Sequence, residues 1–132
     1  SYLRNLMKRL VFIFIATALS FFAKAQSDSV KLAELKFETL FYDFDTIDYE
    51  KPVSYIFKFK NIGKADLMLK NVIAGCKCTT ADWSKIPIKK HKKGFVKITY
   101  NAGTKGEFYK TIIVNTNGKT ANQSLTIKGI VR

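Results

Sequence analysis

The sequence predicts an all-β domain, an antiparallel β-sandwich of about seven short strands, preceded by an N-terminal signal peptide. Apolar and polar residues alternate in several short runs, and turn residues separate these runs. After the first 25 residues no window of about eleven residues keeps the 3.6-residue period of a helix. The chain has 132 residues, enough for one ordinary domain, and its 47% hydrophobic content excludes a disordered tail.

Residues 1–25 have the three parts of a secretory signal peptide. A cationic start at 7–9 precedes the apolar run Leu10–Ala23, and small residues allow cleavage between Ala25 and Gln26. As a helix this 14-residue run would reach roughly 21 Å, short of the ~30 Å hydrocarbon core of a bilayer. We therefore expect a cleaved signal, a periplasmic or secreted protein, and no membrane span after cleavage. Residues 1–6, which precede Met7, are interpreted as a start-site artefact.

We expect a short linker over residues 26–33. The sandwich domain begins after it, at residue 34, with the first strands. Residues 35–44 supply one or two strands. In residues 53–60 the side chains of one set alternate with those of the other, which is typical of a half-buried strand: Val53, Tyr55, Phe57 and Phe59 on one side and Ser54, Ile56, Lys58 and Lys60 on the other. The Asn-Ile-Gly sequence that follows favours a turn. Residues 67–73 form the next apolar run.

The last expected strands are 96–100, 108–114 and 125–131, and the domain extends to residue 132. Asn117-Gly118 between the last two strongly indicates a hairpin. Antiparallel pairing is favoured because no crossover helix is available to join parallel strands. The large side chains expected to fill the core are Tyr55, Phe57, Phe59, Trp83, Phe95 and Phe108.

Four motifs occur in an order that resembles a known family. They are YDFDTI at 42–47, FKFKNIG at 57–63, CKCTT at 76–80 and LTIKGIV at 125–131. The ordered set is similar to the bacterial domain-of-unknown-function family fifteen-seventy-three, which is related to hydin-type domains. The resemblance implies an immunoglobulin-like fold in an exported protein, and it implies no established activity. Asp45 stands where the family has Gly, which requires a side chain that tolerates a left-handed turn, as Asp does.

Cys76 and Cys78 are the most specific candidates for chemistry. Residues two apart in a strand face the same side, and a bend at Gly75 could bring the two sulfurs together. Four interpretations stay open: a structural pair at a strand end, a labile redox pair, a soft-metal site for Cu(I), and an intermolecular disulfide. Zinc is disfavoured because two thiolates and the distant His91 leave its tetrahedron incomplete.

The second candidate is a basic loop, which could bind an anionic glycan, lipid headgroup or acidic partner or could simply be solvated. Its residues are Lys89, Lys90, His91, Lys92 and Lys93. The chain carries 23 basic and 10 acidic side chains, for a formal charge of +13, and Arg132 is the only arginine after the signal. Because Arg suits phosphate and base edges better than Lys does, we expect no nucleic-acid partner.

These patterns predict a non-enzymatic binding or structural protein of the bacterial cell envelope, with an envelope protein or glycan as partner and no cofactor. The alternative is thiol redox or copper handling by Cys76 and Cys78. No phosphate-binding loop, nucleophile elbow or paired acid–base motif is present in the sequence.

Overall fold

The computed structural model describes residues 1–18 and 30–132, which form two separate units, Ser1–Val30 and Lys31–Arg132. In the first unit, helix α1 spans Tyr2–Ala18. None of the helices in the described ranges is long and apolar enough to cross a membrane. The expected cleavage site at Ala25 and Gln26 lies outside the described residues, so the signal peptide stays a prediction.

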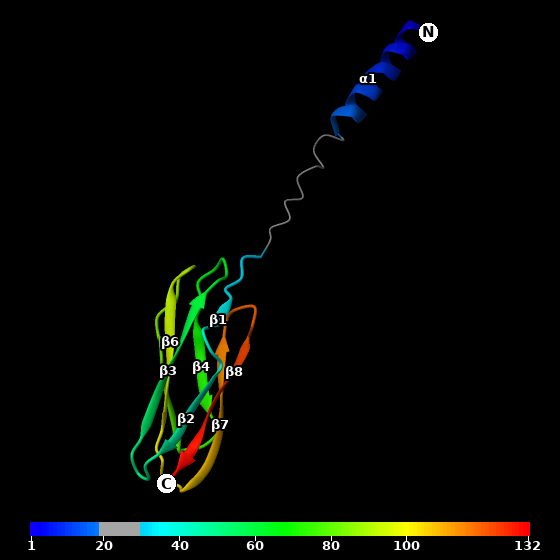
Figure 1. The fold of residues 1–132 in the computed structure, drawn as a ribbon. Helices are drawn as coiled ribbons and strands as arrows, with labels where there is room; N and C mark the ends of the chain where they lie inside the picture. Colours follow the sequence, from blue (N-terminus) through cyan, green and yellow to red (C-terminus); the bar gives the residue numbers. More distant parts are fainter. Residues whose placement is uncertain (19–29) are drawn as a thin grey trace. The chain divides into compact units, whose positions relative to one another are not determined.

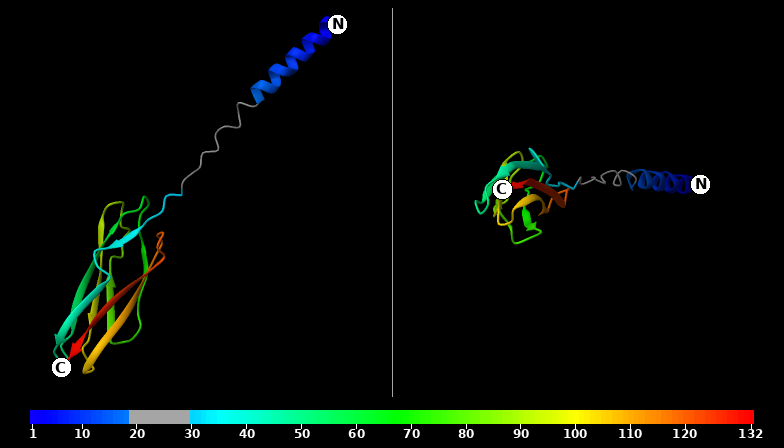
Figure 2. Two further views of the ribbon diagram at one scale, coloured as in Figure 1. Left: turned by 45° about the vertical axis from the view of Figure 1, so that its right-hand side comes forward. Right: turned by 60° about the horizontal axis from the view of Figure 1, so that its bottom comes forward.

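The second unit is a sandwich of two four-stranded sheets (Figure 1). One sheet has the order β1-β3-β6-β5 and the other the order β2-β8-β7-β4. The strands run along the length of the sandwich, as two further views show (Figure 2). Their bounds are β1 Leu35–Phe37, β2 Phe41–Ile47, β3 Val53–Asn61, β4 Leu69–Ala74, β5 Thr79–Trp83, β6 Lys93–Tyr100, β7 Gly106–Thr116 and β8 Asn122–Val131.

The core lies between the sheets and is built by the expected alternation. Phe57 and Phe59 of β3 are almost completely buried, and Ile112 and Leu125 face them from the other sheet with no exposed surface. Burying a side chain of this size contributes about 1.5–3 kcal/mol. Phe108 is also buried, as predicted, and stacks on Tyr100 with ring centroids 4.0 Å apart.

Phe95 was expected in this core, and that expectation is wrong. Its side chain is 37% exposed, whereas its neighbour Val96 is completely buried. Because alternate residues of a strand face opposite sides, burial of Val96 and Ile98 forces Phe95 to the outer face of β6. Tyr55 and Trp83, which were also expected in the core, are partly buried and pack against the core cluster.

Two features of the topology differ from the sequence prediction. The domain has eight strands, because β5 follows the two cysteines directly; it has five residues and one large apolar side chain, and its pairing with β6 defines it. In addition, β2 pairs with β8 in parallel, so the sandwich is not wholly antiparallel. The link from β1 to β2 carries the chain to the other sheet without reversing it, and the rest of the domain serves as the long connection that parallel strands need.

The parallel pair is interrupted by a bulge at Asp45. Its φ angle of 56° is left-handed, which confirms the prediction that this position must tolerate such a turn. The register with β8 shifts between Asp43 and Thr46, and the Asp45 backbone N–H donates to the Asp43 carboxylate at 2.8 Å. A β-carbon on Gly129 of β8 would lie 3.0 Å from the Asp45 carbonyl oxygen, so Gly129 allows the bulge to approach.

Candidate functional site

Lysines gather on the outer face of the β1-β3-β6-β5 sheet. Along β3 and β6 the residues that alternate with the buried core are mostly exposed, and half of them are lysines. This surface, which we call the lysine face, consists of Lys36 on β1, Lys58 and Lys60 on β3, and Lys93 and Lys97 on β6. The strand register places all five side chains on the same side of the sheet.

Three of these lysines form a row across three neighbouring strands. Lys60 pairs directly with Lys36 on one side and with Lys93 on the other. Neighbouring strands lie about 4.8 Å apart, so the row spans about 10 Å. Like charges directly opposite each other destabilise a sheet, by an amount comparable with the roughly 0.2–1 kcal/mol that a favourable pair contributes. The row therefore costs stability in the isolated domain.

Few carboxylates compensate this charge. Lys93 Nζ lies 4.0 Å from Glu38, both side chains being largely exposed, and Lys97 pairs in register with Asp82 of β5. Within residues 30–132, no ion pair is formed by Lys36, Lys58 or Lys60. The face thus keeps a net positive charge that an external anion could neutralise.

Two apolar side chains lie among the lysines. Phe95 is directly opposite Lys58, and Lys93 and Lys97 flank it along β6. Ile56, which is 46% exposed, is directly opposite Lys97. The face therefore offers an aromatic ring with positive charge on three sides.

The predicted basic loop adjoins this face, because Lys93 is both its last residue and the first residue of β6. Lys89 pairs with Asp66 at 3.6 Å. His91 is exposed and has a left-handed φ of 64°, and its backbone N–H donates to the Asn61 carbonyl at 2.8 Å. Lys90 and Lys92 are exposed in the same loop.

Of the five residues of the lysine face, the sequence analysis singled out only Lys93. It missed the other four as binding residues. Their period-two spacing in FKFK and VKIT was visible, but it shows only that each strand has a polar side. Placing Lys36, Lys60 and Lys93 side by side requires the register between strands that lie far apart in the sequence.

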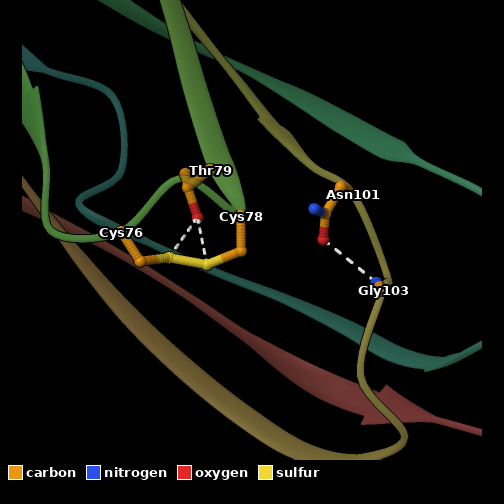
Figure 3. Close-up of a disulfide and its surroundings, with 5 residues drawn as sticks. All are labelled: Cys76, Cys78, Thr79, Asn101 and Gly103. Carbon is orange, nitrogen blue, oxygen red and sulfur yellow. Dashed lines mark hydrogen bonds between the residues drawn. A yellow bond between two sulfur atoms is a disulfide. The ribbon is translucent and has the colours of Figure 1, made fainter.

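The two cysteines form an intramolecular disulfide at the corner where the chain passes from β4 in one sheet to β5 in the other. Their Cα atoms are 5.3 Å apart, and both residues are half-buried. The Thr79 hydroxyl lies 3.8 Å from the Cys76 sulfur and 3.6 Å from the Cys78 sulfur (Figure 3). The Asn101 backbone N–H donates to the Cys78 carbonyl at 2.9 Å, which ties the corner to the end of β6.

A cavity of about 480 Å³ lies beside the Asp45 bulge, between β2, β7 and β8. Asp43, Asp45, Glu107, Tyr109 and Lys128 contribute polar groups to its lining. Asp43 of β2 and Lys128 of β8, which are paired in register, form an ion pair at 3.4 Å in this lining. Neither the lysine face nor the disulfide lines this cavity, so the three features are separate.

The sheet order and the solved structures that resemble the domain define an immunoglobulin-like, PapD-like sandwich. A protein of unknown function from Porphyromonas gingivalis W83 matches with a TM-score of 0.67 and 15% identity, over 76% of this chain and 47% of that one. The ASH/PapD-like domain 7 of human CEP192 matches with a TM-score of 0.64 and 10% identity, over 76% of this chain and 87% of that one.

A third structure, the CsuC–CsuE chaperone–tip adhesion subunit complex of Acinetobacter baumannii, has a TM-score of 0.55 and 13% identity, with coverages of 76% and 58%. At such identities the likeness shows the fold alone, and this chain spans about half the length of the Porphyromonas protein. The chain belongs to the family described as "Protein of unknown function (DUF1573)", whose model matches residues 35–131. This match confirms the resemblance drawn from the four motifs. No curated protein matches the sequence.

Proposed function

We propose that this chain is an exported, non-enzymatic binding domain of the bacterial cell envelope, and that it holds an anionic partner on the lysine face. The observation that carries the proposal is the row Lys36–Lys60–Lys93, in which like charges lie opposite each other on three strands. Such a row destabilises the free domain and becomes favourable when an anion lies across it.

Export is supported by two features of the chain. The N-terminal residues have the pattern of a secretory signal, and the two cysteines are oxidised to a disulfide, which persists in oxidising compartments. The proposal places the sandwich in the periplasm or outside the cell. The basic loop Lys89–Lys93 then extends the lysine face at one end and needs no catalytic role or cofactor.

Neutralising three lysines tests this function. The variant Lys58→Gln, Lys60→Gln, Lys97→Gln should bind polyglutamate and polygalacturonate on the order of 100-fold more weakly, because each lysine near an anionic surface contributes about 1 kcal/mol. Affinity is measured by calorimetry at low ionic strength. A matched variant, Lys70→Gln, Lys105→Gln, Lys119→Gln, loses the same charge from exposed positions outside the face. Equal loss in both variants would show that net charge, rather than the lysine face, binds the anion.

Thiol redox chemistry is the second candidate function, favoured by the half-buried disulfide at an exposed corner. A dithiol reductant would supply two electrons and two protons, leave two thiols at Cys76 and Cys78, and itself become a disulfide. Only the reduced pair would offer thiolates to Cu(I). Mass spectrometry after alkylation, in a series of dithiothreitol buffers, tests this candidate. Reduction only after unfolding in urea would contradict it.

A further inference from the structure

The chemistry of the lysine face restricts the kind of anion that fits it. Four partner classes could be drawn to a positive sheet: a second copy of this chain, an anionic membrane, a nucleic acid, and another acidic polymer. A second copy is disfavoured because residues 26–132 carry 19 basic side chains (23 less the four in 1–25) against 10 acidic ones, and copies of like net charge repel each other. The partner must bring most of the negative charge itself.

The arrangement of the charges indicates an extended ligand. The five lysines lie on the outer face of a sheet, and the 480 Å³ cavity contains none of them. Lys93 and Lys97 are four residues apart on one strand, a distance of roughly 13 Å, while the row across the strands spans about 10 Å. A polymer that crosses this area meets several separate positive charges, which suits many weak contacts better than one tight contact.

The ring of Phe95 adds a second requirement for the ligand, which must contact an aromatic ring as well as the positive charges. Phe95 is 37% exposed, lies in the middle of the face, and has Lys58, Lys93 and Lys97 around it. On its fourth side its backbone N–H is bonded to the Ser84 hydroxyl at 3.0 Å, and this bond holds the strand in place. The Phe95 ring can stack on a ligand ring that has an apolar face, and the surrounding ammonium groups can bind negative charges at the edge of that ligand ring.

We infer that the partner on the lysine face is an acidic polysaccharide, in which one sugar acid stacks on Phe95 and its carboxylate, with those of neighbouring sugars, meets the surrounding lysines. This inference rests on the proposed anion-binding function. Hydroxyl groups complete the match, because Ser54 and Thr99 lie on the same face, joined by a hydrogen bond of 2.7 Å. Single-stranded nucleic acid could also stack on Phe95, but every basic residue of the face is a lysine, and Arg is the residue suited to planar phosphate and base recognition.

The experiment compares two anionic polymers that differ in their rings. Polygalacturonate has a sugar ring for each carboxylate, and polyglutamate has none. The full chain should bind polygalacturonate about five- to tenfold more tightly than polyglutamate at equal carboxylate concentration, a preference in the range that aromatic stacking supplies. Phe95→Ala should remove this preference and leave polyglutamate binding unchanged. Phe95→Trp, which keeps a ring, should retain it.

The control for Phe95→Ala is Tyr109→Ala, which removes an aromatic side chain that is 67% exposed on the other sheet and should change neither affinity. Equal affinity for both polymers, unaffected by Phe95→Ala, would overturn the inference while leaving anion binding in place. Tighter binding to oligothymidine, or to vesicles of phosphatidylglycerol and phosphatidylcholine, would assign the face to those partners and overturn it as well. Failure to bind either polymer would remove the proposed function and the inference together.

Discussion

At the scale of single residues, Asn61 explains why the loops at the end of β3 are ordered. It is completely buried, and its side chain satisfies all four of its hydrogen-bonding positions. The amide nitrogen donates to the carbonyls of Ala65 and Ile88, each at 2.8 Å. The amide oxygen accepts from the backbone N–H groups of Gly63 at 3.0 Å and Glu34 at 3.2 Å. Three segments of the chain therefore meet at one side chain.

Gly63, two residues later in the same motif, has a related role. A β-carbon at this position would collide with the backbone of residues 32–34. Those residues are bound there, since the Leu32 carbonyl accepts from Lys64 and the Glu34 carbonyl from Ile62, at 2.8 and 2.9 Å. The sequence showed Asn61 and Gly63 only as turn residues, because their partners lie in parts of the chain that the fold brings together.

Replacing Asn61 by Ala should lower the free energy of unfolding by about 3–5 kcal/mol, because two carbonyls and two N–H groups would lose their partner in the interior. Urea titration followed by the fluorescence of Trp83, the single tryptophan, measures the change. The control is Asn117→Ala. Asn117 also makes two side-chain bonds to backbone, but it is exposed, so water can replace them and the loss should stay under about 1 kcal/mol. Equal losses in the two variants would contradict this role of Asn61.

At the scale of elements, strand register turns an ordinary alternating pattern into a charged surface. The alternation of β3 and β6 was predictable, and so was the burial of Phe57 and Phe59. The neighbours of each strand were not, because a one-residue difference in register or a different strand order would separate Lys36, Lys60 and Lys93. The short strand β5 and the parallel β2–β8 pair were missed for the same reason, since tertiary pairing decides them.

The lysine row predicts opposite effects on stability and binding in one variant. Lys60→Glu places an acid between Lys36 and Lys93, so two repulsive pairs become attractive and the free energy of unfolding should rise by about 0.5–1 kcal/mol. The same change should weaken polygalacturonate binding, because the central positive charge is lost. Urea titration and calorimetry on one sample measure both.

The matched control for this variant is Lys70→Glu. Lys70 is exposed on the edge strand β4 of the other sheet, outside the row. It should change both quantities little. A Lys60→Glu domain that is less stable than the wild type would show that the row is not a source of repulsion in the free protein.

At the scale of the whole molecule, charge is separated along the sandwich. Strand β3 begins just after the acidic turn that contains Asp48 and Glu50, and it ends at Asn61, where the basic loop is bonded. The clustering of acids before residue 51 and of lysines after it was visible in the sequence. The fold adds that the lysines share one face, which concentrates positive potential there and favours encounter with an anionic ligand from that side.

Binding of an acidic polysaccharide on the lysine face is tested most directly by mapping backbone amide shifts during titration of the ¹⁵N-labelled chain with polygalacturonate. The largest changes should occur on β3 and β6 around Lys58, Lys60, Phe95 and Lys97, and they should disappear on addition of salt. Changes gathered at the Cys76–Cys78 corner, at the cavity beside Asp45, or evenly over all exposed lysines would contradict binding on the lysine face.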